Sequence, residues 1–292
     1  MAATMTPLAF AKKYLELDVY VFPPEVSSGG PKAGYVPPTG WQRLKADNYR
    51  LGKSPWRDIF WSQDIQKQFV KPVTVCVKTI SGSREEVVFR NGAQASYHFL
   101  APFLGKGSPE QVQMAIQLVY RFRKVITPLE VFVDKDFIGL DCNGFVGNYY
   151  QKVVQGQHWQ SAKWNTSPGP ESLMEPLLKL GDEIKELTDL QVAGTYIFAW
   201  CDDRGNIMEP NGKGSYGHVM ITEPNTLKGA PGAQTIQVVE ATAAGKRKLR
   251  YLDYTLKSAT KVVVKGQKVT VFKVQRGPGE KDMDVRISRL KV

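Results

Sequence analysis

The second half of the chain is dominated by short segments with a strand pattern, and this feature most limits the fold. They are rich in β-branched and other apolar residues, which is typical of strands. The segments are Val192–Trp200, His218–Thr222, Ile236–Ala241, Lys261–Lys265, Lys268–Val274 and Asp284–Leu290. Because no helical pattern interrupts them, we expect them to form an antiparallel sheet.

Helix signals precede this set of strands. Ser108-Pro109-Glu110 combines an N-cap residue, a proline suited to the first helical position and an acid at the positive helix end, and apolar residues then recur at helical spacing. A second helix is expected directly after Cys142, and a third, amphipathic and acidic, over Glu175–Leu187. Helices followed by antiparallel strands predict an α+β fold with helices packed on the sheet.

The first 107 residues follow a different pattern. Val21–Gly40 is rich in proline and glycine and predicts a loop. Val73–Ile80 and Glu85–Arg90 predict a β-hairpin, because both are rich in β-branched residues and a Ser-Gly-Ser turn separates them. We therefore predict a loop-rich N-terminal region over residues 1–107, whose role the sequence does not assign, and a second domain over residues 108–292.

Composition and charge restrict the partners. The net charge of +11 favours anionic partners such as cell-wall polymers, but no nucleic-acid-binding signature is present, so nucleic acid is not an expected partner. The three cysteines do not suggest a disulfide framework, and no cysteine or histidine pair has zinc-site spacing, so we expect no metal and no cofactor. No apolar run reaches about 18 residues, so no membrane span is expected.

The start of the chain does not fit a secretory signal. Lys12 and Lys13 follow the apolar residues instead of preceding a longer apolar stretch. We therefore expect a protein that is cytoplasmic in the cell that makes it, or one that a signal-independent system exports.

Cys142 lies in the segment Asp141-Cys142-Asn143-Gly144 and is followed by apolar residues at helical spacing. The free N–H groups and the dipole at a helix start favour an anion there, which makes this a suitable position for a reactive thiolate. Asn143 and Gly144 are small and would leave room for a substrate carbonyl, and backbone N–H groups could stabilise its oxyanion. The alternative is a buried structural cysteine, with Asp141 acting only as a helix cap.

A histidine and an acid follow in two successive strand segments. His218, after Gly217, opens a segment in which it shares a face with Met220 and Thr222. Glu240 lies in the next segment among apolar residues, where an unpaired carboxylate would be costly. A hydrogen bond to the His218 imidazole would satisfy Glu240 and fix the histidine tautomer. The alternatives are a surface histidine and a half-exposed glutamate.

These segments, in this order, resemble NlpC-type cell-wall cysteine peptidases of the papain-like superfamily. DCNGFV (141–146) resembles the family pattern D-C-S-G-[LF]-V, and GHVMI (217–221) resembles G-H-V-[GA]-I. LQVAGTYIFAW (190–200) and VVEAT (238–242) are similar to the intervening strand and to the strand of the third catalytic residue. The resemblance covers about Ser108–Val292. This chain departs from the family at Asn143, at Glu240 and in lacking the tyrosine motif upstream of the nucleophile.

The resemblance implies a papain-like catalytic domain with an N-terminal extension and a Cys142-His218-Glu240 arrangement. It implies a cysteine hydrolase that cleaves amide bonds in peptidoglycan stem peptides, as a lysin or as a secreted antibacterial effector with a cognate immunity or inhibitor protein. Two alternatives stay open. One is a papain-like deamidase, transglutaminase or acyltransferase acting on protein or lipid, and the other is a basic binding module on an inactive fold.

Four further residues could take part in binding or catalysis. Trp159 and Trp164 are candidates for a substrate groove, together with Asp141, Asn143, Gly144 and Gly217, although two tryptophans near a loop also serve as packing. His158 is the competing base, but a surface role suits it better. Cys201 precedes Asp202 and Asp203, whose charges would raise its pKa and make it a poor nucleophile.

Overall fold

The strand-forming segments assemble into one antiparallel sheet of seven strands in the computed structural model, which describes residues 5–22, 39–45, 72–122, 140–209, 217–242 and 248–291. The strand order is β10-β9-β8-β7-β6-β11-β5, and β10 also pairs with β11, so all strands except β5 form a closed ring. The strands are β5 (Gly181–Glu183), β6 (Tyr196–Trp200), β7 (Val219–Thr222), β8 (Gln234–Thr242), β9 (Lys248–Val264), β10 (Gln267–Arg276) and β11 (Asp282–Leu290).

The closed ring has an apolar interior. Successive side chains of a strand point to opposite faces, and on β8 Ile236 and Val238 belong to the buried cluster inside the ring. Val239 and Ala241 belong to a second cluster on the opposite face, which also contains the helices. Glu240 therefore shares its face with the interior residues of β8, so a carboxylate occupies the end of an apolar row.

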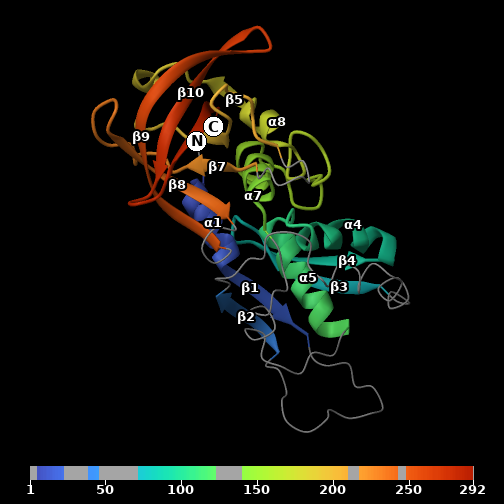
Figure 1. Ribbon diagram of the computed structural model, residues 1–292. Helices are drawn as coiled ribbons and strands as arrows, with labels where there is room; N and C mark the ends of the chain where they lie inside the picture. Colours follow the sequence, from blue (N-terminus) through green and yellow to red (C-terminus); the bar gives the residue numbers. More distant parts are fainter. Residues whose placement is uncertain are drawn as a thin grey trace.

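Helix α7 (Cys142–Tyr149), continued by the π-helical turn η1 (Tyr150–Val154), lies against β7 and β8. Figure 1 shows α7 between the closed sheet and a second layer of hairpins and helices. The elements of this layer are β1 (Glu16–Val21), β2 (Gly40–Lys45), β3 (Val73–Lys78), β4 (Arg84–Phe89), α4 (Gly92–Phe103) and α5 (Pro109–Phe122). The α+β class is thus confirmed.

Helix α1 (Pro7–Leu15) joins the two layers. The ring centroid of Phe10 lies 5.8 Å from that of Phe145 and 5.7 Å from that of Tyr149, both on α7. The Tyr14 hydroxyl donates to the carbonyl of Gly107 at 3.0 Å. One buried cluster therefore runs from α1 through α7 to the sheet and crosses residue 107, where the sequence predicted a boundary.

Helix α5 and the β3–β4 hairpin match their predictions. The Ser108 hydroxyl accepts from the N–H of Gln111 at 3.3 Å, as expected of an N-cap residue. Gln113 and Gln117 on α5 each bond to both backbone groups of one β3 residue, Lys78 and Cys76 respectively. These amides satisfy β3 groups that no neighbouring strand pairs.

The acidic helix predicted over 175–187 is wrong beyond its first turn. Helix α8 covers only Met174–Leu178, residues Gly181–Glu183 form β5, and a 3-10 turn, η2, covers Leu187–Asp189. Pairing with β11 decides the conformation here, because the backbone of Gly181 packs directly on Arg289 of that strand and Glu183 accepts from Arg286 at 2.9 Å. Tertiary pairing overrides the local helical pattern.

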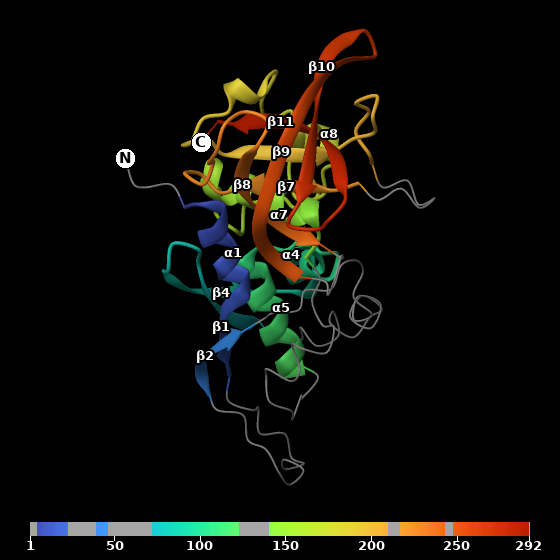
Figure 2. The same ribbon diagram turned by 60° about the vertical axis from the view of Figure 1, so that its left-hand side comes forward.

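Strand β9 is longer than the sequence indicated. It runs unbroken over 17 residues and pairs first with β8 and then with β10, with a tight turn at Lys265-Gly266, where φ is 49° and 80°. Figure 2 shows the β9–β10 hairpin projecting beyond the rest of the sheet. The first part of β9 was not predicted, because the basic run of residues 246–248 with Arg250 indicates a solvated turn.

Helices α1 and α4 and the β1–β2 hairpin were also not predicted. The loop predicted over Val21–Gly40 lies mostly outside the described residues. Strand β6 begins at Tyr196, four residues later than expected. None of the helices in the described ranges has the length and apolar character that crossing a membrane requires.

Candidate functional site

Cys142 is the first residue of α7, as predicted from its neighbours. Asp141 is the N-cap, and its side chain accepts from the N–H of Gly144 at 2.7 Å. The N–H groups of Cys142 and Asn143 lie in the first turn of the helix, where no intrahelical acceptor exists. Cys142 is 8% exposed. A helix start and a nearly covered sulfur therefore meet at this position.

His218 directly precedes β7 and brings an imidazole to that sulfur. Trp200 on β6 donates its backbone N–H to the carbonyl of His218 at 2.9 Å, and the Trp200 ring packs edge-on against the imidazole at 5.0 Å. The His218 side chain lies close enough to Cys142 for the two to interact and for Cys142 to raise the pKa of the ring. Its Nε2 lies 2.8 Å from Oε2 of Glu240. Because Nε2 faces Glu240, Nδ1 is the ring nitrogen that remains for the sulfur.

The charge of His218 follows from these contacts. Burial opposes protonation of the ring, but the hydrogen bonds and charges of Cys142 and Glu240 outweigh burial and raise the pKa of His218 to about 9. At neutral pH the ring is therefore an imidazolium, with a proton on each nitrogen. The structure brings together the three residues that the sequence proposed as catalytic.

Glu240 is fully buried and is held by five donors. Oε2 accepts from His218 and from the Tyr254 hydroxyl at 3.1 Å. Oε1 accepts from Nε of Arg250 at 2.9 Å and from Nε and Nη2 of Arg276 at 3.0 and 2.7 Å. Burial alone would raise the pKa of Glu240, but His218 and Arg276 lower it to about 2. Glu240 is thus an anion among three cations.

Sequence reasoning missed Arg250, Tyr254 and Arg276. Arg250 is the direct cross-strand partner of Glu240 on β9, and Arg276 on β10 is the cross-strand partner of Tyr254. The Glu240–Arg250 pair could have been predicted only if the first part of β9 had been recognised as a strand next to β8. An arginine directly opposite a buried glutamate would then have indicated an ion pair.

The small residues beside Cys142 are engaged in packing. Asn143 donates to the carbonyl of Ser172 at 2.8 Å and accepts from Nζ of Lys106 at 2.6 Å. The backbone carbonyl of Gly105 occupies the space that a side chain at Gly144 would need, and the carbonyl of Met208 does the same at Gly217. A role for these residues in substrate binding stays a prediction, and the open space expected beside Gly144 is filled.

The two tryptophans pack against the other layer. Trp159 is fully buried, and its Nε1 donates to Glu85 of β4 at 3.0 Å. Trp164 is buried as well and donates to the carbonyl of Tyr97 on α4 at 2.8 Å. These contacts are those of core residues and do not favour the predicted substrate groove.

His158 is largely exposed and bonds to Glu85 at 3.0 Å, so its described contacts lead away from Cys142. The other cysteines are buried in environments that disfavour a thiolate. Burial raises the pKa of Cys76, with a contribution from Glu86. Burial and the charges of Asp284 and Asp202 raise the pKa of Cys201 to about 12, in the direction expected from its acidic neighbours.

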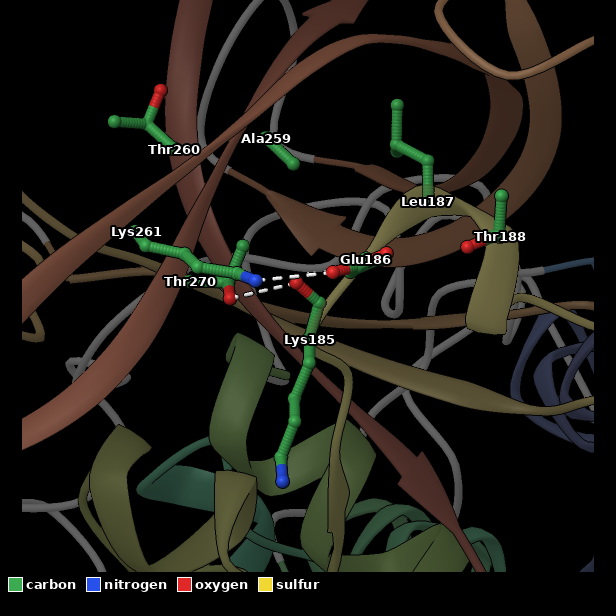
Figure 3. A pocket seen from close by; sticks show the side chains of 8 residues that line it. All are labelled: Lys185, Glu186, Leu187, Thr188, Ala259, Thr260, Lys261 and Thr270. Carbon is green, nitrogen blue, oxygen red and sulfur yellow. Dashed lines mark hydrogen bonds and ion pairs between the residues drawn. The ribbon is translucent and has the colours of Figure 1, made fainter.

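A groove of about 620 Å³ lies elsewhere, between η2 and the β9–β10 hairpin (Figure 3). Its walls are joined by the Lys261–Glu186 ion pair at 3.0 Å and by the Thr270 hydroxyl, which donates to the carbonyl of Lys185 at 2.9 Å. None of the three proposed catalytic residues lines it. Within the described residues, no three His, Cys, Asp or Glu side chains are grouped as metal ligands.

The pKa shifts predict how stability depends on pH. Because the pKa of His218 rises from 6.5 to about 9 on folding, its protonation stabilises the fold fully below pH 6.5 and this contribution is lost as pH rises through 9. The pKa of Glu240 falls from 4.5 to about 2, so its contribution is present above pH 4.5 and is lost as pH falls towards 2.

Between pH 6.5 and pH 9, urea denaturation should therefore show an unfolding free energy that falls as pH rises through the pKa of His218. His218→Gln, which cannot titrate, should flatten this decline. An equally steep decline in the variant would mean that another group is responsible.

No protein-family model, curated protein or solved structure matches this chain.

Proposed function

We propose that this protein is a papain-like cysteine hydrolase of the NlpC type, which cleaves amide bonds through Cys142, His218 and Glu240. The observation that supports this most is the chain of contacts from the sulfur through the imidazole to a buried carboxylate. A nucleophile, a base that touches it and a third group that orients the base are what covalent catalysis requires. Cys142 lies on α7, His218 precedes β7 and Glu240 lies on β8, so the three side chains meet only in the folded protein.

The first step forms a thioester. An imidazolium stabilises a thiolate next to it, and the Cys142 thiolate attacks the carbonyl carbon of the amide. The carbonyl oxygen takes the electron pair, and the N–H groups of Cys142 and Asn143, in the first turn of α7, would donate to it. The C–N bond then breaks as His218 gives its Nδ1 proton to the leaving nitrogen.

The second step restores the enzyme. His218, now neutral, takes a proton from a water molecule as that water attacks the thioester carbon. The C–S bond breaks, the product leaves as a carboxylic acid and the thiolate and imidazolium are formed again. Glu240 keeps the ring oriented through Nε2 in both steps, and its own position is fixed by Arg276, Arg250 and Tyr254.

The proposed substrate is an amide bond in a peptidoglycan stem peptide. This follows from the likeness of 141–146 and 217–221 to NlpC motifs, and the net charge of +11 suits an anionic wall. As an exported antibacterial effector, the protein would also need an inhibitor in the producing cell.

Digestion of purified peptidoglycan tests the substrate. Wild-type protein should release fragments whose masses show one hydrolysed amide bond of the stem peptide, and Cys142→Ala should release none while keeping the wild-type melting temperature. Loss of the sulfur removes the nucleophile without removing a partner of Glu240.

If neither the wild-type protein nor Cys142→Ala releases fragments, the wall substrate is wrong. Trapping of a thioester on Cys142 by a protein or lipid substrate would then favour the deamidase, transglutaminase or acyltransferase alternative. Retained cleavage by Cys142→Ala would contradict the cysteine mechanism itself.

A further inference from the structure

Lys106 contacts both residues that flank Cys142. Its Nζ lies 2.7 Å from Oδ2 of Asp141 and 2.6 Å from Oδ1 of Asn143. Lys106 belongs to the loop between α4 and α5, so it reaches the start of α7 from a distant part of the chain. Lys106 is 8% exposed, and an ammonium buried to this degree needs anionic or hydrogen-bonding partners such as these two side chains.

The rest of the same loop holds the same helical turn. The carbonyl of Gly105 accepts from the N–H of Asp141 at 3.1 Å, and Asn148, one turn further along α7, donates to the carbonyl of Lys106 at 2.9 Å. The absence of a side chain at Gly144 allows the carbonyl of Gly105 to approach closely. The residues before and after Cys142 are therefore fixed by one loop.

The position of Lys106 affects the charge next to Cys142 as well as the packing of this turn. Asp141 must accept from the N–H of Gly144 to cap α7, yet a carboxylate one residue from Cys142 repels a thiolate. The ammonium of Lys106 compensates this charge. Two charged side chains from other elements interact with this turn: Lys106 with Asp141, and His218 with Cys142. Glu240 lies behind His218.

We propose that Lys106 is a positioning residue for the nucleophile: it cancels the charge of the Asp141 cap and ties residues 141 and 143 together, so that Cys142 can carry a negative charge while facing His218. The inference depends on the proposed cysteine hydrolase function and adds a residue to its machinery.

The test is the pH profile of Cys142 alkylation. Iodoacetamide reacts with the thiolate, and peptide mass analysis gives the rate at each of the three cysteines separately. In Lys106→Met the uncompensated Asp141 should move the midpoint of the Cys142 profile to higher pH by about one unit. The double variant Lys106→Met/Asp141→Asn should return the midpoint close to that of wild type.

Lys152→Met is the matched control. The Lys152 side chain is 3% exposed and forms an ion pair with buried Glu110 at 3.4 Å, so its loss should lower stability as much as the loss of Lys106. It should leave the midpoint of the Cys142 profile unchanged. A midpoint shift in Lys106→Met no larger than in Lys152→Met would overturn the inference.

Asp141→Asn decides the question if Lys106→Met does not fold. Asparagine caps helices as well as aspartate, so this variant should fold while Lys106 keeps its charge, and its midpoint should move to lower pH. An unchanged midpoint would contradict the role proposed for Lys106 but not the proposed hydrolase function. If wild-type Cys142 reacts no faster than Cys76 and Cys201, the proposed hydrolase function fails and this inference fails with it.

Discussion

Replacing His218 with alanine is expected to lower the rate of amide cleavage by at least about 10³-fold. The variant loses both the cation that stabilises the thiolate and the group that transfers protons to the leaving nitrogen and from water. It should nevertheless fold, because Glu240 keeps Arg250, Arg276 and Tyr254 as partners. The measurement is kcat/KM on the wall fragment identified by digestion, together with the rate of Cys142 alkylation at neutral pH.

His158→Ala is the matched control for this variant. His158 is the other histidine that the sequence offered as a base, and its described contacts are with Glu85 on the opposite layer. Its replacement should leave both rates within a factor of about two, as expected for an exposed residue away from the site. Equal losses in the two variants would show that general destabilisation, and not base catalysis, explains the effect of His218.

Replacing Glu240 with glutamine is expected to reduce the unfolding free energy by about 3–5 kcal/mol. The amide replaces the carboxylate that His218, Arg250 and Arg276 share, and Arg276 is nearly as buried as Glu240 itself. Removing one member of a buried charged network leaves the others uncompensated in a medium that solvates them poorly. Urea denaturation at neutral pH measures the loss, and amide cleavage should fall because the imidazole loses its orienting partner.

Asp282→Asn provides the comparison at the surface. Asp282 pairs with Lys257 at 2.6 Å, but both side chains are more than a third exposed, so the change should be within about 1 kcal/mol. If Glu240→Gln is destabilised no more than Asp282→Asn, the two arginines must reach water or another acid when the carboxylate is removed. That result would remove the proposed reason for the low pKa of Glu240.

The helix start at Cys142 illustrates what local sequence can predict. The pattern of Asp141, Cys142 and the apolar residues behind them predicts a helix start, because capping and helical spacing are local properties. The same holds for Ser108 at α5 and for the β3–β4 hairpin. These elements lie where their sequences placed them, since their hydrogen bonds join residues that are close in the chain.

The region after α8 illustrates the limit. Residues 181–183 carry a helical and acidic pattern but form a strand, because β11, about a hundred residues later in the chain, supplies hydrogen-bond partners that no helix could replace. The first part of β9 was also not predicted, although here the sequence indicated no regular element at all. Its inward arginine looks wrong for a strand until Glu240 is placed opposite it.

The sequence by itself determined the α+β class, the start of the helix that carries Cys142, and the identity of the residues proposed for catalysis. These depend on residue types, caps and periodicity, which act over a few neighbouring positions. Only the tertiary structure decided that Cys142, His218 and Glu240 meet, that three cationic side chains surround the glutamate, and that Lys106 pairs with Asp141. Each of these contacts joins distant segments, and their energies depend on burial, which is created only when the layers close over the site.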